Sequence, residues 1–174
     1  MGLRQRLQTT LRELGAFNAL LYFLQRSLSR LSGNRIEIFK YYFIAQPVAA
    51  SAMVRGGTTM TIREIYASDK EAQDLPRPPH VIADRYRQGA RCLALFRGAE
   101  CIGFIWFVLG EYSEDEVRCV YKLDSQCAWD FDVYIEPKFR LGRAFARLWD
   151  SANQVMAQAN RRWTLSRISA FNPG

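Results

Sequence analysis

The chain has 174 residues, of which 49% are hydrophobic and 24% are charged, and this composition is typical of one globular domain with a real core. The formal net charge of +7 indicates an anionic partner, such as nucleic acid, a lipid surface or a phosphorylated cofactor. No apolar run reaches the roughly 18 residues that a transmembrane helix needs, so no transmembrane helix is predicted.

The N-terminal segment, residues 3–31, is predicted to be an amphipathic helix. Its apolar residues recur at steps of three and four and form one stripe: Leu14, Phe17, Leu21, Leu24, Leu28 and Leu31. Gly15 is a point at which the helix would split, and Gly33 is a natural stop. The opposite face is rich in arginine. Three partners remain open for this basic extension, residues 1–33: its own domain, a second subunit of a homodimer, or an anionic membrane surface.

Residues 34–174 are expected to form the main domain, an α+β fold with a mixed, mostly antiparallel sheet flanked by helices. The predicted elements are strands 35–47 and 59–66, short helices after Asp69 and over 80–88, a hairpin of strands 91–97 and 100–109, strands 117–123 and 127–135, helix 140–160 and strand 163–171. Gly98-Ala99 fits a type II′ turn in the hairpin. Strand 127–135, the long helix and the last strand form one βαβ unit, which favours a ligand at the carboxyl end of the strand.

The cysteines, Cys92, Cys101, Cys119 and Cys127, include no CxxC pair, and His80 is the only histidine. These residues lack the spacing of zinc ligands, so we predict no metal. Three of the cysteines lie in apolar runs, where a thiol behaves as a small hydrophobe. We therefore expect a reducing compartment and a cytoplasmic location.

The run from Ala128 to Arg147 carries the most chemical information. It predicts a strand, a proline stop and an arginine-flanked glycine that opens a helix. The start of such a helix offers free N–H groups, and here Arg140 and Arg143, to an anion such as a diphosphate. Asp130 and Asp132 precede the turn on one face of the predicted strand, and either carboxylate is a candidate base.

These residues resemble the GNAT superfamily of acyl-CoA-dependent N-acyltransferases, over roughly residues 59–174 and most sharply over 132–140. The resemblance implies that the strand backbone pairs with the pantetheine arm of acetyl-CoA, that the following loop binds its diphosphate, and that an Asn follows the last strand. In this sequence the implied cofactor-binding residues are Val133, Tyr134, Ile135, Arg140, Leu141, Gly142, Arg143, Ala144 and Asn172. Two features depart from the family: Phe139 stands where Gln or Arg is usual, and the sequence ends at Gly174, before the helix and strand with which members continue.

The resemblance implies an N-acetyltransferase that uses acetyl-CoA and an unidentified primary amine. Asp132 or Asp130 would take the proton of the amine, and attack would be direct because no Cys or Ser lies in a nucleophile motif. The alternative is a non-catalytic GNAT-like scaffold that docks to a membrane or partner through residues 1–33. Nucleic-acid binding is not expected, since the sequence has no helix-turn-helix, zinc finger or RNA-recognition aromatic pair.

Overall fold

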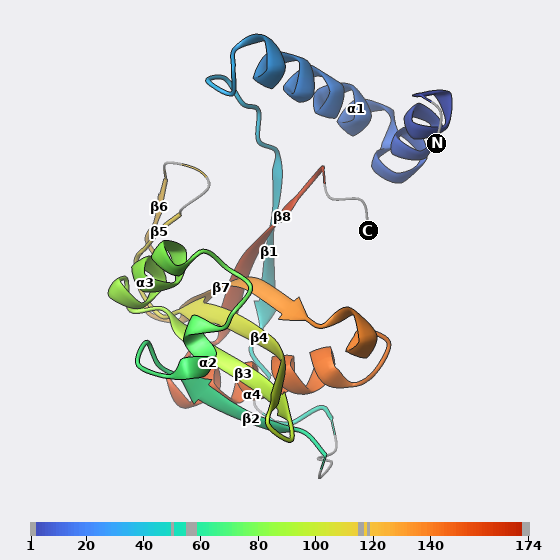
Figure 1. Cartoon of the computed structure of the whole chain (residues 1–174). Helices are drawn as coiled ribbons and strands as arrows, with labels where there is room; N and C mark the ends of the chain where they lie inside the picture. Colours follow the sequence, from blue (N-terminus) through green and yellow to red (C-terminus); the bar gives the residue numbers. More distant parts are fainter. Residues whose placement is uncertain (1–2, 50, 55–58, 115–116, 118, 172–174) are drawn as a thin grey trace. The chain divides into compact units, whose positions relative to one another are not determined.

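The structure is a computed structural model that describes residues 3–49, 51–54, 59–114, 117 and 119–171 (Figure 1). The chain forms two compact units: Met1–Ile44 with Arg167–Gly174, and Ala45–Ser166. The strands are β1 (Tyr41–Pro47), β2 (Thr61–Ile65), β3 (Arg91–Arg97), β4 (Glu100–Val108), β5 (Tyr112–Ser113), β6 (Val120–Tyr121), β7 (Cys127–Ile135) and β8 (Trp163–Ser169). The helices are α1 (Leu3–Leu31), α2 (Lys70–Gln73), α3 (Pro79–Arg87), the 3₁₀ turn η1 (Pro137–Phe139) and α4 (Ala144–Gln158).

The main sheet has the strand order β1-β8-β7-β4-β3-β2, and β5 pairs with β6 in a separate small sheet. The neighbouring pairs β2–β3, β3–β4 and β4–β7 run antiparallel. In contrast, β7 and β8, which α4 connects along the chain, pair in parallel. The predicted mixed, mostly antiparallel fold is therefore confirmed. The β3–β4 hairpin turns at Gly98, whose φ of 60° suits the first position of a type II′ turn.

Two apolar clusters cover the two faces of this sheet. Side chains of α2 and α3, such as Ala72 and Ile82, pack on one face with Trp106. Leu148 and Met156 of α4 pack on the other face. The apolar residues of α4 are spaced three or four apart, so they lie on one side of the helix, and this side packs on the sheet.

The pairing of β4 with β7 contains a bulge that shapes the site. Phe104 pairs with Tyr134 and Trp106 pairs with Phe131, so β7 carries one extra residue between the two pairs. Asp132 lies in this insertion with a φ of 49°, in the left-handed region that L residues rarely adopt. Beside it, glycine is favoured at position 103 because a Cβ there would lie 2.8 Å from the backbone oxygen of Tyr134, as well as 2.6 Å from Ile135 Cδ1.

The first unit is built around α1, which Gly15 interrupts with φ 76° and ψ 162°, as the sequence predicts. Asn18 and Lys40 fasten the helix to the start of β1: Asn18 Nδ2 donates to Tyr42 Oη at 3.1 Å, and Lys40 Nζ donates to Asn18 Oδ1 at 2.6 Å. No helix among the described residues is both long enough and apolar enough to cross a bilayer.

Three predicted elements differ from the structure. The first strand begins at Tyr41 instead of residue 35. Strand 117–123 is reduced to Val120–Tyr121 among the described residues. The long helix begins at Ala144 instead of Arg140, because Pro137 opens a 3₁₀ turn and residues 140–143 form a further turn.

Candidate functional site

The site is centred on the point where β7 leaves β8. In the part of the chain that the structure describes, the two strands pair from Cys127 with Trp163 to Trp129 with Leu165, and β7 then continues to Ile135. Glu136 N–H donates to Ile102 O of β4 at 2.9 Å. Because N–H direction alternates along a strand, the N–H group of Ile135 points away from β4. This edge of β7 therefore presents backbone groups beyond its last pair with β8.

The turn after β7 leads directly to the start of α4. Arg140 Nε donates to Ile135 O at 2.9 Å, which ties the turn to the end of the strand. Gly142 N–H donates to Phe139 O at 3.2 Å, so this predicted diphosphate ligand is engaged within the turn. Leu141 and Arg143 are exposed, and Ala144, the first residue of α4, is buried. The first turn of a helix has N–H groups without intrahelical acceptors, so Arg143 and this turn together could hold an anion.

The first turn of α4 also has an uncovered apolar side chain. Phe145 is spaced four, seven and eleven residues from Trp149, Ala152 and Met156, which places all four on the sheet-facing side of the helix. Met156 is 1% exposed, whereas Phe145 is 49% exposed. Phe145 stacks on Trp149 with ring centroids 6.1 Å apart. Within the described part of the chain, the sheet-facing side of α4 is thus left uncovered at Phe145, beside the turn that precedes the helix.

Asp130 is buried between β7 and β8. Trp129 and Phe131 pack in the cluster under α2 and α3, so Asp130 between them points to the opposite face. Thr164 Oγ1 donates to Asp130 Oδ2 at 2.5 Å. Burial raises the pKa of Asp130 to about 6, although hydrogen bonds from Thr164 and Ser166 partly offset this effect.

Asp132 occupies a different environment, so the prediction that the two aspartates share a face is wrong. The extra residue of the bulge breaks the two-residue alternation of the strand and turns Asp132 toward α2 and α3. Arg77 Nε donates to Asp132 Oδ2 at 2.7 Å, and Arg77 Nη2 donates to Oδ1. Arg85 Nη1 also donates to Oδ2. Both oxygens of Asp132 are therefore already held by guanidinium groups.

Arg77 and Arg85 link this carboxylate to two other elements. Arg77 lies between α2 and α3, where its Nη1 donates to Pro76 O at 2.7 Å, and Arg85 lies on α3. The Arg85 guanidinium lies over the ring of Phe131 at 5.3 Å. The side chain of Arg85 is 8% exposed, so the ion pair is largely shielded from water. Sequence reasoning missed both arginines, and their only signal was a position in or beside the proline-rich loop.

Comparison with known proteins rests on structure alone. No protein-family model matches this sequence, and no curated protein is significantly similar to it. A functionally unknown conserved protein from Staphylococcus epidermidis superposes with a TM-score of 0.54 at 10% identity, over 82% of this chain and 56% of that one. A tandem GNAT protein from the clavulanic acid biosynthesis pathway superposes with a TM-score of 0.50 at 13% identity, over 84% of this chain and 50% of that one. The chain has a GNAT-superfamily fold.

At these identities the likeness establishes the GNAT fold, and activity must be argued from the site. The chain spans about half the length of the two structures. Asn172, which the resemblance placed near the cofactor, lies outside the described residues. Among the described residues, no group of three or more His, Cys, Asp and Glu side chains is arranged to hold a metal ion.

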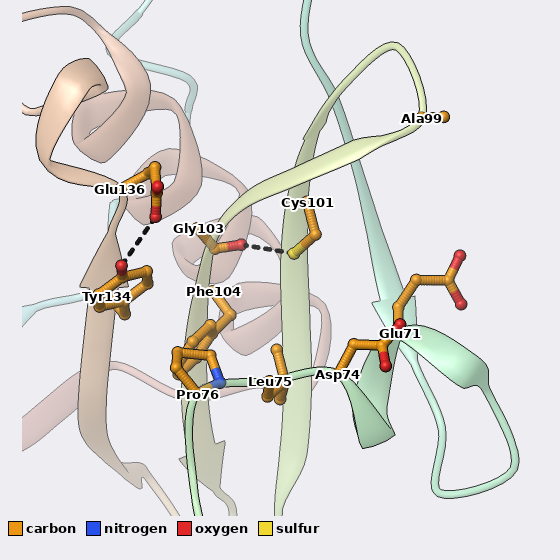
Figure 2. Close-up of a pocket in the computed structure, with 10 residues that line it drawn as sticks. All are labelled: Glu71, Asp74, Leu75, Pro76, Ala99, Cys101, Gly103, Phe104, Tyr134 and Glu136. Atoms are coloured by element: carbon orange, nitrogen blue, oxygen red, sulfur yellow. Dashed lines mark hydrogen bonds between the residues drawn. The ribbon is translucent and has the colours of Figure 1, made fainter.

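The face of the GNAT sheet that carries Asp132 also holds an acidic pocket of about 370 Å³. Figure 2 shows Tyr134 and Glu136 on one side of it, and Glu71 and Asp74 on the other. Tyr134 Oη donates to Glu136 Oε2 at 2.8 Å, and this hydrogen bond raises the pKa of Tyr134. The carboxylates would favour a cationic ligand. Sequence reasoning placed none of them in a site, although Glu136 lies within the 132–140 motif.

Proposed function

We propose that the chain is an acyl-CoA-dependent N-acyltransferase that moves an acetyl group from acetyl-CoA to a primary amine. The observation that carries this proposal is the continuity of three features: the β7 edge beyond Trp129, the helix start at Arg143, and the uncovered Phe145. An acyl-CoA has the matching chemistry, since its pantetheine amides can pair with a strand, its diphosphate suits a helix N-terminus, and its alkyl groups can cover a phenyl ring.

In this proposal the cofactor lies along β7 toward α4. The backbone of Val133 and Ile135 would pair with pantetheine, and the N–H group of Ile135 would polarise the thioester carbonyl as negative charge develops on its oxygen. Arg143 would contact the diphosphate with the N–H groups of the first turn. Arg140 would act indirectly, because its Nε already holds Ile135 O and fixes the turn against the strand.

The acceptor amine is protonated at neutral pH and must lose a proton before it attacks. A base works best when its pKa lies near the working pH, as that of Asp130 does, but this carboxylate is buried and faces α4, away from the acidic pocket, so we assign it the proton only through intervening water. Asp132 would instead hold the acceptor side of β7 in shape, since two arginines occupy its oxygens. The amine nitrogen would then bond to the acetyl carbon while the carbon–sulfur bond breaks, and the coenzyme A thiolate that leaves would take the second proton lost by the nitrogen.

The acidic pocket supports an acceptor that carries more than one positive charge. Asp74 and Glu136 would hold an ammonium group while a second amine reaches the thioester, whereas Glu71 already pairs with Arg63 Nη2 at 2.6 Å. A polyamine or a polyamino sugar has this chemistry. A panel of amines, with release of the coenzyme A thiol as the readout, would test this part of the proposal.

Calorimetric titration with acetyl-CoA tests the cofactor site. Arg143→Glu should weaken binding about 10- to 100-fold, as expected for loss of a charge-assisted hydrogen bond of roughly 1.5–3 kcal/mol. Phe145→Ala should also weaken it. Lys138→Ala is the matched control, because this basic residue of the same turn pairs with Glu100 Oε1 at 2.5 Å. Absence of binding at millimolar acetyl-CoA, or equal effects of the Arg143 and Lys138 variants, would refute the proposed site.

A further inference from the structure

An apolar stripe on α1 faces away from the rest of its own unit. The stripe consists of Phe17, Leu21, Leu24, Leu28 and Leu31, at alternating steps of four and three. The side chains that lie seven residues apart are the exposed ones: Phe17 is 65% exposed, Leu24 45% and Leu31 86%. So much apolar surface on one helix face indicates that another surface covers it.

The first unit packs against a different face of α1. Asn18 and Tyr22, four residues apart, make its contacts: Asn18 bonds to Tyr42, and the Tyr22 ring lies 6.0 Å from the ring of Phe171. Ala19, on the same side, is fully buried. The strands of this unit therefore occupy the more polar face of the helix and leave the stripe uncovered.

The spacing of the stripe is that of a helix packed against another helix. Steps of four and three average 3.5 residues, the repeat at which the apolar seam of one helix stays in contact with that of a second helix. The residues beside the seam, Leu20, Gln25 and Ser27, are uncharged.

The arginines that follow Gly15 in α1, Arg26 and Arg30, lie away from the stripe. Arg26 is about 200° around the helix from Leu24, and its Nη1 donates to Tyr22 Oη at 2.8 Å. An anionic membrane would attract arginines placed beside the apolar face, whereas this arrangement lets two basic chains meet without repulsion at the seam. The exception is Lys40, whose Nζ lies 4.7 Å from the ring centroid of Phe17 at one end of the stripe.

We propose that a second copy of this chain covers the stripe, with the two α1 helices antiparallel about a twofold axis near Leu24. In this arrangement Phe17 of each helix meets Leu31 of the other, and the two Lys40 side chains lie at opposite ends of the pair. The contact is isologous, so the same surface serves both chains and the pair closes on itself. This inference does not depend on the proposed acetyl transfer.

Light scattering of the full chain over a concentration series tests the dimer. The wild type should have twice the mass of one chain and dissociate on dilution, and Leu24→Glu should be monomeric. Arg26→Glu is the matched control, because it places the same residue two positions away on the opposite face and should remain dimeric. Circular dichroism of both variants checks that α1 is intact. A wild type that is monomeric throughout, or equal masses for the two variants, would overturn the proposal.

Cross-linking and vesicle binding separate the other possible occupants. Under oxidation, Leu24→Cys should give a covalent dimer that neither Arg26→Cys nor the wild type, with its own cysteines, gives. A wild type that stays monomeric and sediments with phosphatidylserine vesicles, with sedimentation lost in Leu24→Glu, would overturn the proposal in favour of a membrane. A monomer that ignores vesicles would overturn it in favour of cover by the same chain.

Discussion

Replacing Asp132 with alanine would test whether this carboxylate holds β7 to the α2–α3 region. Removing one partner of a buried ion pair costs about 3–5 kcal/mol. The Arg77 side chain is 28% exposed and that of Arg85 is 8% exposed, so we expect the lower end of this range. Alanine at a φ of 49° adds about 1 kcal/mol, for a total loss near 4 kcal/mol. Asparagine tolerates this φ, so Asp132→Asn should lose less, about 2 kcal/mol.

Urea denaturation followed by tryptophan fluorescence measures this effect, because Trp106 and Trp129 lie in the cluster beside the network. Glu100→Gln is the control, since it removes an exposed partner of Lys138 and should leave the midpoint unchanged. Arg77→Ala combined with Asp132→Ala should cost less than the sum of the single variants, because the carboxylate and the guanidinium are directly coupled. A loss below about 1 kcal/mol for Asp132→Ala would refute the structural role that we give this residue.

Three further changes probe the core and the candidate base. Gly103→Ala would bring a Cβ to 2.6 Å from Ile135 Cδ1 and 2.8 Å from Tyr134 O, so it should lower the free energy of unfolding by about 1–3 kcal/mol and weaken acetyl-CoA binding; unchanged values would contradict the close approach. The folded pKa of Asp130, about 6, lies above its ordinary 3.8, so the folded chain binds this proton more tightly than the unfolded chain. The free energy of unfolding of the wild type relative to Asp130→Asn should therefore be highest below pH 4 and fall by about 3 kcal/mol up to pH 7. Urea midpoints of the two proteins that keep a constant difference across this pH range would contradict the raised pKa of Asp130. Leu148→Ala should cost about 2–5 kcal/mol by leaving a cavity under α4, as chemical denaturation would show.

Much of the fold could be predicted because its signals are local. The sequence predicts β7 with both of its ends, since an apolar run precedes a proline that ends the strand. Gly98 predicts the hairpin turn, and Gly15 predicts the break in α1, because both adopt a positive φ. The resemblance centred on residues 132–140 also predicts the GNAT fold, which the structural comparison supports.

The arrangement of the candidate site depended on contacts between residues far apart in the chain. Strand periodicity places Asp130 and Asp132 on one face, but the extra residue in β7 becomes visible only when its register with β4 is known. Arg77 and Arg85 reach Asp132 across 55 and 47 residues, a separation that no local pattern encodes. The sequence alone therefore determined which elements form, because propensity and periodicity act over a few neighbours. Tertiary structure decided which aspartate is held by arginines and which is buried with a raised pKa, because pairing and burial depend on neighbours that only the folded chain brings together.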